Sequence, residues 1–351
     1  MAKIMAKRVV LFLAMCSFSF SGGGPRASAQ QDGQPRIQVN VVLVQLSVAV
    51  TDNKGNYVSG LRPQDFAIYE DKIPEKASTF EEGVGPGHSL VTGQLADDRP
   101  FAVGPDGVAD PMHTSGANIF VLFDTSNYMY RGFVFAQDAI ADFIRSLEGV
   151  GKVALYSYSR DLSRVVTLTP DRSQVLHGLR STVAGDDAAL YNSLLLTVKD
   201  AAPLTGRKAI VVFSNGPDNA SLVPPEDVAE LAQSTGTIIY MISTKQAQSE
   251  PVSTAVFERM SKATGGKAYF SKDWRDEKNA FSSIRDDLAH LYALSYYPAP
   301  NPNRGWRTIT VKLVGKNLQQ YHIRTRTGYR LLQTQLSGGG IATTDAAPAS
   351  N

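Results

Sequence analysis

The sequence predicts an α/β protein, with an open and mostly parallel sheet covered by helices on both faces, together with a β domain built from strands near both ends of the chain. Three observations predict this fold class. The middle of the chain alternates short apolar runs with amphipathic segments, as βαβ units do. The flanking regions alternate apolar and polar residues, as strands with one buried face do. The 351 residues are 43% hydrophobic and 19% charged, which is ordinary for a folded protein.

Residues 1–29 are predicted to be a secretory signal peptide. Three basic residues precede an apolar run from Val9 to Phe20, and Ala27-Ser28-Ala29 ends the segment before the expected cleavage site. The run is too short to remain as a membrane anchor, so we expect a periplasmic or extracellular protein with no stable membrane anchor after cleavage. An alternative is lipoprotein cleavage before Cys16, which the bulky Met15 and the apolar residues that follow disfavour.

Charge and cysteine content exclude several classes of function. Four of the 35 basic residues and none of the 33 acidic residues lie within residues 1–29, so the rest of the chain is close to neutral. A near-neutral chain offers no global electrostatic attraction for nucleic acid. Cys16 is the only cysteine, so a chain cleaved after Ala29 has none. Disulfides, thiolate catalysis and cysteine-ligated zinc are therefore excluded for that chain.

Residues 30–82 are predicted to form the N-terminal β strands. The segment from Ile37 to Thr51 is rich in apolar and β-branched residues, and its second half alternates them with more polar ones. The sequence Asp52-Asn53-Lys54-Gly55-Asn56 has the composition of a hairpin turn. Shorter strands are expected near Tyr57-Val58 and at Ala67 to Glu70.

Residues 118–291 are predicted to be the α/β region, and residues 83–117 before it are a linker rich in Gly and Pro. The uninterrupted apolar run from Ile119 to Phe123 is typical of a central strand buried on both faces, and it ends at Asp124. Further strands are expected at Val153 to Tyr158, Ala209 to Phe213 and Thr237 to Ile242. Intervening helices are indicated by apolar stripes at Ala136, Ile140, Phe143, Ile144 and Leu147, at Leu190, Leu194 and Val198, and at Phe281, Ile284, Leu288 and Leu291, and by the helix start Pro224-Pro225-Glu226-Asp227.

The pattern returns to β at residues 292–331, which we expect to pair with the N-terminal strands in one β domain. Strands are expected at Tyr292 to Tyr297, Trp306 to Leu313 and Gln320 to Thr327. Arg324 and Arg326 should share one strand face. We expect that face to be solvated, with contact to an anionic envelope polymer as the alternative. Residues 332–351 are rich in Gly, Ala, Ser and Thr and are expected to be a disordered tail.

Three loops carry a resemblance to a known family. Asp124-Thr125-Ser126-Asn127-Tyr128, after the first α/β strand, resembles the opening of the metal-ion-dependent adhesion site of von Willebrand factor type A domains. Gly185-Asp186-Asp187-Ala188-Ala189-Leu190-Tyr191 is similar to the second loop of that site. Arg207-Lys208-Ala209-Ile210-Val211-Val212-Phe213-Ser214-Asn215-Gly216 is similar to the fourth strand and third loop. The resemblance extends from about Ile119 to Leu291.

Motifs outside these loops narrow the resemblance to the secreted VWFA-related domain proteins of the acidobacterial type. The N-terminal motifs are Gly60-Leu61, Asp65-Phe66, Glu70-Asp71 and Phe80, and the C-terminal ones are Tyr292-Ala293-Leu294-Ser295-Tyr296-Tyr297-Pro298 and Gly328-Tyr329. This family is recognised by sequence and mostly lacks an assigned biochemical function. The resemblance therefore implies a fold and a binding site rather than a reaction.

The site of the type A family holds a divalent cation, usually Mg²⁺, and leaves one coordination position for a carboxylate of the partner. Its pattern is Asp-x-Ser-x-Ser on the first loop, Thr on the second and Asp on the third. Asp124 and Ser126 match this pattern, whereas Tyr128, Ala188 and Asn215 stand at non-matching positions. Because Mg²⁺ requires near-octahedral oxygen ligation, we expect no bound cofactor, or at most weak Mg²⁺ binding through Asp124 and Ser126.

Nearby polar residues leave alternatives open. Asp186 and Asp187 could replace missing ligands, although acids are also favoured at the start of a helix by capping and by the helix dipole, and we prefer that interpretation. Asp218 is another possible substitute, with a turn as the simpler explanation. A shift in the alignment of the second loop would make Thr182 a candidate instead.

Enzyme signatures are absent from the sequence. It has no Gly-x-Ser-x-Gly elbow and no His-Glu-x-x-His helix, and its five histidines are scattered. We therefore expect a non-enzymatic protein-binding module that presents Asp124, Ser126, Asp186, Asp187 and Asn215 to a protein partner of unknown identity. The runner-up is an Mg²⁺-dependent, adhesin-like domain that uses Asp124, Ser126 and one substitute acid. A third hypothesis is a hydrolase with an unrecognised site.

Overall fold

The computed structural model describes residues 43–83, 88–89, 116–147, 149–243 and 251–331. The predicted signal peptide, most of the predicted linker and the predicted C-terminal tail lie outside the described residues. Their sequence-based assignments therefore stay predictions.

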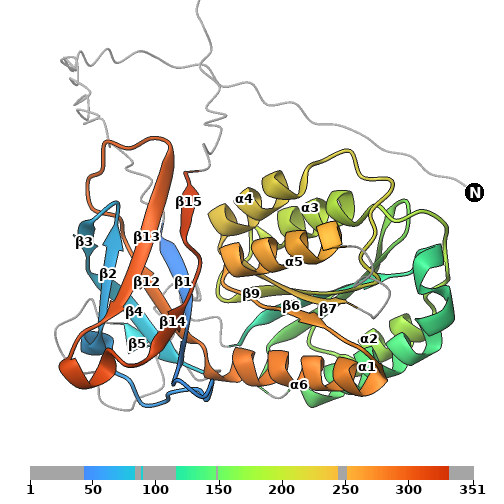
Figure 1. The fold of residues 1–351 in the computed structure, drawn as a ribbon, viewed down its shortest axis with the longest axis horizontal. Helices are drawn as coiled ribbons and strands as arrows, with labels where there is room; N and C mark the ends of the chain where they lie inside the picture. Colours follow the sequence, from blue (N-terminus) through green and yellow to red (C-terminus); the bar gives the residue numbers. More distant parts are fainter. Residues whose placement is uncertain (1–42, 84–87, 90–115, 148, 244–250, 332–351) are drawn as a thin grey trace, which may run out of the picture. The chain divides into compact units, whose positions relative to one another are not determined.

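The central element is a six-stranded sheet with the order β11-β10-β9-β6-β7-β8. Figure 1 labels its strands β9, β6 and β7. All neighbouring strands are parallel except β7 and β8. The strands are β6 (Asn118–Asp124), β7 (Lys152–Tyr158), β8 (Leu162–Thr169), β9 (Lys208–Ser214), β10 (Thr237–Ser243) and β11 (Ala268–Phe270). Every residue of β6, β9 and β10 is buried, which explains why these strands are nearly continuous apolar runs.

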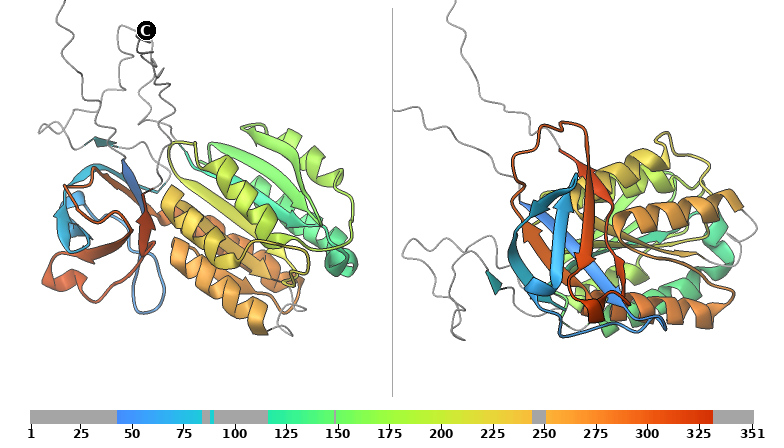
Figure 2. Two further views of the ribbon diagram at one scale, coloured as in Figure 1. Left: turned by 90° about the horizontal axis from the view of Figure 1, so that it is seen from above. Right: turned by 60° about the vertical axis from the view of Figure 1, so that its left-hand side comes forward.

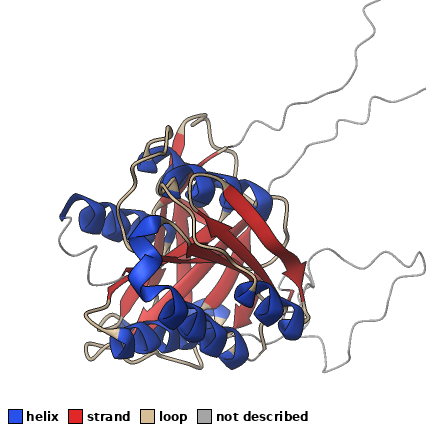
Figure 3. Cartoon of the chain, turned by 90° about the vertical axis from the view of Figure 1, so that its right-hand side faces the viewer, coloured by secondary structure: helices blue, strands red, loops and turns tan. Residues whose placement is uncertain are grey.

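Helices cover both faces of this sheet (Figure 3). One face packs against α1 (Phe133–Ser146), α2 (Arg172–Arg180) and α6 (Trp274–His290), and the other against α3 (Leu190–Ala201), α4 (Pro225–Thr235) and α5 (Pro251–Thr264). Each face has its own apolar core, so the sheet separates two hydrophobic layers. The predicted α/β fold class is thereby confirmed. No helix in the described ranges is long and apolar enough to cross a membrane.

Strands from both ends of the chain lie side by side in two antiparallel sheets (Figure 2, blue and red). The two sheets share one hydrophobic core. One sheet has the order β14-β1-β12-β4-β5 and the other β15-β13-β2-β3. The strands are β1 (Val44–Thr51), β2 (Phe66–Glu70), β3 (Ile73–Glu75), β4 (Ala77–Glu82), β5 (His88–Ser89), β12 (Tyr292–Tyr296), β13 (Trp306–Leu313), β14 (His322–Arg324) and β15 (Gly328–Arg330). We call this pair of sheets the sandwich.

The N-terminal strand β1 lies between two C-terminal strands. Leu46 is opposite Leu294 on β12, and Val50 is opposite Ile323 on β14. The sequence prediction that the two ends of the chain pair with each other is therefore confirmed. The turn after β1 forms because the Asp52 carboxylate accepts hydrogen bonds from the backbone N–H groups of Lys54 and Asn56, at 2.8 and 2.9 Å.

The C-terminal strands differ from the prediction in two respects. The single strand expected from Gln320 to Thr327 is replaced by β14 and β15, which belong to different sheets. The expected solvated face for Arg324 and Arg326 is also wrong. Arg326 is only 6% exposed and donates to the backbone carbonyls of Gln233 and Gln45, the latter at 2.8 Å.

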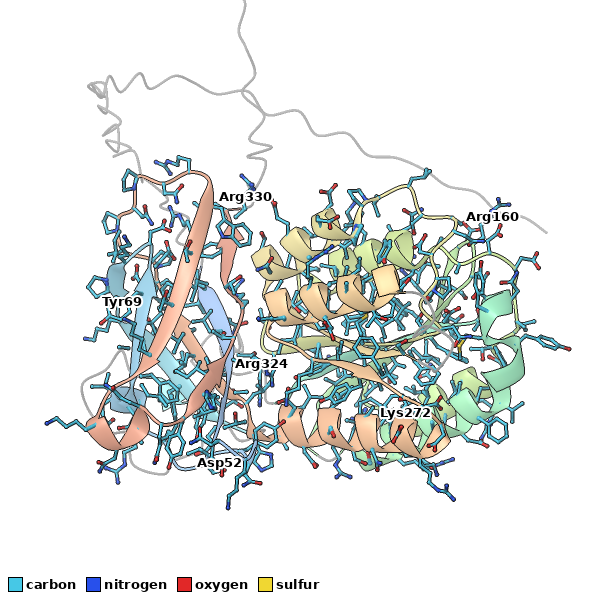
Figure 4. The ribbon with its side chains drawn as sticks, viewed as in Figure 1. Asp52, Tyr69, Arg160, Lys272, Arg324 and Arg330 are labelled. Atoms are coloured by element: carbon cyan, nitrogen blue, oxygen red, sulfur yellow. The ribbon has the colours of Figure 1, made fainter. Side chains whose placement is uncertain are left out.

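Arg324 is the second of these arginines, and it extends from β14 to the buried Asp287 on α6 (Figure 4). Asp287 also accepts hydrogen bonds from the hydroxyls of Tyr57, at 2.6 Å, and Tyr240, at 2.5 Å. The basic side chains are buried because they connect the sandwich to the α/β region. A single sequence does not reveal such a connection, since its periodicity describes each strand by itself.

Candidate functional site

Three loops meet at the carboxyl end of the parallel sheet, where open α/β sheets bind their ligands. The backbone N–H of Gly185 donates to the carbonyl of Thr125 at 2.7 Å, and that of Asn127 donates to the carbonyl of Asp186 at 2.8 Å. The third loop joins them, because the N–H of Asn219 donates to the carbonyl of Ala188 at 3.0 Å. The structure thus brings together the three loops that the sequence analysis selected.

Asp124 ends the central strand β6 and is fully buried. One carboxylate oxygen, Oδ1, accepts the backbone N–H of Ser126 at 2.9 Å. The other, Oδ2, accepts the hydroxyl of Ser214 at 2.9 Å and the backbone N–H of Asn215 at 3.3 Å. Both oxygens therefore already have partners from the protein itself.

Tyr158 is a site residue that the sequence analysis missed. It ends β7 directly beside Asp124 in the strand register, is fully buried, and donates its hydroxyl to Ser214 Oγ at 2.9 Å. The result is a chain of hydrogen bonds from Tyr158 through Ser214 to Asp124. A signal was present in the sequence, because a buried Tyr at the carboxyl end of a strand next to β6 needs a polar partner near that site.

Burial raises the pKa of Asp124 above its ordinary value of 3.8, although the neighbouring polar groups of Ser126, Ser214 and Tyr158 oppose this effect. Burial also raises the pKa of Tyr158, and the neighbouring Asp124 carboxylate adds to that rise. These shifts indicate an environment that does not favour a negative charge on Asp124.

The other residues at the family's ligand positions differ in the hydrogen bonds that they make. Ser126 is fully buried and its hydroxyl makes no hydrogen bond, although it lies close enough to Asp124 to lower the pKa of that carboxyl. Asn215 is also buried, and its side-chain amide donates to the backbone carbonyl of Tyr128. Ala188 is fully buried and contributes only backbone groups. Of the five positions, only Asp124 and Ser126 offer matched ligand atoms, and both lie beneath the surface.

The acids of the second loop do not cap the following helix, so the capping interpretation is wrong. Helix α3 begins at Leu190, and its N-cap is Ala189. Asp187 instead accepts a hydrogen bond from Asn219 at 3.2 Å and forms an ion pair with Arg160 at 3.5 Å. Asp186 is exposed, and its carboxylate has no hydrogen bond or ion pair with any residue that the structure describes.

Asp218 stabilises the third loop and the start of α3 through hydrogen bonds. Its carboxylate accepts the backbone N–H of Tyr191 at 3.0 Å and that of Ser221 at 2.9 Å, which supports the prediction of a turn acid. Thr182 bonds to the backbone carbonyl of Leu179 at 2.8 Å, away from these contacts. Neither residue is bonded to Asp124.

The donor set does not fit a divalent cation well. The described part of the chain contains no group of three or more His, Cys, Asp or Glu side chains that could hold a metal ion. Asp124 is the only carboxylate at the matched positions, and both of its oxygens accept protein hydrogen bonds. Oδ2 accepts two of these bonds and Oδ1 one, so Asp124 keeps only one lone pair, on Oδ1, for a cation.

Exposed apolar side chains gather on the segment that follows the first loop. This segment comprises a short 3₁₀ helix, η2 (Asn127–Gly132), and the first turn of α1. Tyr130 is 76% exposed and Phe135 is 65% exposed, and Tyr128 and Val134 are exposed as well. Exposed apolar groups of this kind are typical of interaction surfaces. We call the four residues Tyr128, Tyr130, Val134 and Phe135 the apolar segment.

Comparison with known proteins supports the resemblance over part of the chain. Residues 119–217 match the family model for the von Willebrand factor type A domain. No curated protein matched the chain significantly. The acidobacterial subtype, which rests on the flanking motifs, stays a prediction.

Several solved structures are similar to part of this chain. The conserved hypothetical protein BatB from Bacteroides thetaiotaomicron has 15% identity and a TM-score of 0.42, and the match covers 49% of this chain and 97% of that one. The vWF domain of the type V pili tip protein Mfa5 from Porphyromonas gingivalis has 12% identity and a TM-score of 0.43, covering 49% and 95%. An aerotolerance-related membrane protein from Bacteroides fragilis has 17% identity and a TM-score of 0.42, covering 49% and 98%.

Proposed function

We propose that this protein is an exported, non-enzymatic protein-binding module whose contact surface lies at the carboxyl end of its parallel sheet. The observation that carries the proposal is the apolar segment, which exposes three aromatic rings and one further apolar side chain within eight consecutive positions beside the three loops. Aromatic residues are enriched at the centres of protein interfaces. Asp186 and Asn215 border this surface, because the backbone carbonyl of Asp186 accepts the N–H of Asn127 and the side-chain amide of Asn215 donates to the carbonyl of Tyr128.

The proposed binding is largely independent of metal. The Tyr158–Ser214–Asp124 hydrogen bonds satisfy the one matched carboxylate without a cation. Asp124 and Ser126 then act beneath the surface by holding the first loop, and they contact a partner only if the loop opens. The site is in this sense a degenerate metal-ion-dependent adhesion site.

A pull-down from the native envelope fraction tests this proposal. Proteins retained by the wild type should be lost or reduced at least about five-fold with Phe135→Asp, because truncating an interface anchor commonly costs more than about 1 kcal/mol. The matched control is Val314→Asp, which changes an apolar side chain that is 51% exposed in the sandwich. Retention should survive a chelator. Equal loss with both variants would contradict the proposed surface.

The runner-up is the Mg²⁺-dependent, adhesin-like domain, and one observation favours it. The hydroxyl of Ser126 is buried without a hydrogen bond, and buried polar groups are nearly always satisfied. Loss of every retained protein upon chelation, and recovery with Mg²⁺, would support this alternative. Export is tested separately by the intact mass of the secreted protein, which should correspond to cleavage after Ala29.

A further inference from the structure

Leu222 lies in the loop between β9 and α4 and is 93% exposed, the highest value among the large apolar residues that the structure describes. An exposed leucine is ordinary by itself, because much of any protein surface is apolar. The backbone here, however, is fixed. The backbone N–H groups of Leu222 and Val223 both donate to the carboxamide oxygen of Asn192, in the first turn of α3, at 3.0 and 3.2 Å. The side chain of Val223 packs against the apolar core beneath.

The chain on either side of this pair is also restrained. Before Leu222, the Asp218 carboxylate accepts the backbone N–H of Ser221 at 2.9 Å, and the Ser221 hydroxyl accepts that of Asn192 at 3.0 Å. After it, Pro224-Pro225 restricts the backbone where α4 begins. Leu222 is therefore presented on a rigid loop, so that binding through it costs little additional ordering of the backbone.

This loop belongs to the proposed contact surface. The backbone N–H of Asn219 donates to the carbonyl of Ala188 in the second loop at 3.0 Å. The second loop is in turn bonded to the first, between the carbonyl of Asp186 and the N–H of Asn127. The loop of Leu222 and the apolar segment follow the neighbouring strands β9 and β6, so both lie at the carboxyl end of the sheet.

The turn around Leu222 offers a partner few free polar groups. Both carboxylate oxygens of Asp218 and the carboxamide oxygen of Asn219 already accept backbone N–H groups of this protein. The contribution of this turn to binding must therefore come mainly from burial of the Leu222 side chain, and it is largest when burial is complete. A flat partner would leave part of the side chain in water, whereas an apolar pocket would surround it.

We infer that Leu222 is an anchor residue that inserts into an apolar pocket of a folded protein partner. The inference rests on the proposed function and adds the shape and chemistry of the partner surface at one point. Asn192 is a positioning residue in this arrangement, because its carboxamide oxygen holds the backbone of Leu222.

Substitutions of Leu222 test the inference. A protein that the wild type retains from the native envelope fraction, and that Phe135→Asp loses, is purified, and its Kd for each variant is measured. Leu222→Ala should weaken binding about ten-fold. Leu222→Asn should weaken it at least as much, because a carboxamide would enter an apolar pocket. Leu222→Met keeps an apolar side chain of similar volume and should weaken binding less than about five-fold.

The matched control is Val314→Ala, which truncates an aliphatic side chain that is 51% exposed in the sandwich and should leave Kd unchanged. Asn192→Ala should weaken binding about three-fold in the wild type and have no further effect when combined with Leu222→Ala. Asn192→Asp keeps an accepting oxygen and should bind like the wild type. Equal effects of Asn192→Ala in both backgrounds would contradict its positioning role.

The outcomes separate the inference from the proposed function. If the Phe135-dependent protein binds Leu222→Ala as well as it binds the control, or binds Leu222→Asn as tightly as Leu222→Met, the inference is wrong while the proposed function stands. If no retained protein depends on Phe135, the proposed function is contradicted and the inference falls with it.

Discussion

Asp124 and Asp287 are both fully buried aspartates of the α/β region, yet their surroundings shift their pKa values in opposite directions. Asp124 accepts hydrogen bonds from hydroxyl and amide groups, and burial raises its pKa. Burial alone would also raise the pKa of Asp287, but the charges of Arg324 and Lys267 bring it below 3.8. The difference shows that the supply of a cation, and not the depth of burial, decides whether a buried carboxylate stays charged.

The two aspartates also differ in where their partners come from. The donors to Asp124 belong to strands and loops of the α/β region itself. The partners of Asp287 include Tyr57 and Arg324, which lie in the N-terminal and C-terminal regions of the sandwich. Asp287 therefore holds two parts of the chain together, whereas Asp124 organises a local set of loops.

The largest expected effect is at Asp287. Arg324→Ala removes the main cation and leaves a buried carboxylate uncompensated, which should lower the free energy of unfolding by about 3–5 kcal/mol. Chemical denaturation measures this loss in the free energy of unfolding. The control is Arg259→Ala, whose exposed pair with Glu226 at 2.9 Å should be worth at most about 1 kcal/mol. A loss at Arg324 no larger than the control would mean that Lys267 and the tyrosines are sufficient for Asp287.

The second test asks whether Asp124 can be given a cation, as Asp287 already has one, by restoring the missing metal ligands. The triple variant Tyr128→Ser, Ala188→Thr and Asn215→Asp restores the hydroxyls and the carboxylate of the family pattern, so it should bind Mg²⁺ or Mn²⁺ measurably by calorimetry. The wild type should bind weakly or not at all. Adding Asp124→Ala to the triple variant should abolish binding. Absence of binding by a folded triple variant would show that the loop alignment is wrong.

A smaller effect should appear in the pH dependence of stability. Because the folded pKa of Asp124 is raised, the unfolded chain loses its proton first, and this group destabilises the fold increasingly as the pH rises above 3.8 toward the folded pKa. Asp124→Asn removes that penalty. Its stability relative to the wild type should therefore increase with pH over this range, by roughly 1.4 kcal/mol for each unit of pKa shift.

For Asp287→Asn we expect the opposite dependence of stability on pH. The folded pKa of Asp287 is lowered, so its contribution is present above 3.8 and is lost as the pH falls through the folded value. Relative to the wild type, Asp287→Asn should lose most stability at neutral pH and least in acid. Parallel pH profiles for the two asparagine variants would contradict the assignment of opposite pKa shifts.

Much of the fold could be predicted because buried strands and amphipathic helices leave strong periodic patterns. The apolar run from Ile119 to Phe123 and the alternation along β1 are examples, and both strands form as expected. Strand β8 and helix α5 were not predicted. Val256, Phe257 and Met260 are all buried on α5 and have helical spacing, so a signal for that helix was available.

The site was predicted less completely, for a physical reason. Sequence motifs located Asp124, Ser126 and Asn215, which do lie together. They did not reveal that Ser214 donates to Asp124 or that Tyr158 donates to Ser214, because those contacts join neighbouring strands of the sheet. The same reason explains the error at Arg324 and Arg326, since the groups that bury them are distant in sequence.

The path of the chain also determines how the molecule responds to mechanical load. The α/β region leaves the sandwich after β4 and β5 and returns at β12, and β4 and β12 are hydrogen-bonded neighbours. Tension applied at residues 43 and 331 is thus carried by interstrand hydrogen bonds of the sandwich. We expect the α/β region to be bypassed until those bonds shear, so the loops at the carboxyl end of its sheet should stay unloaded while the sandwich bears the force.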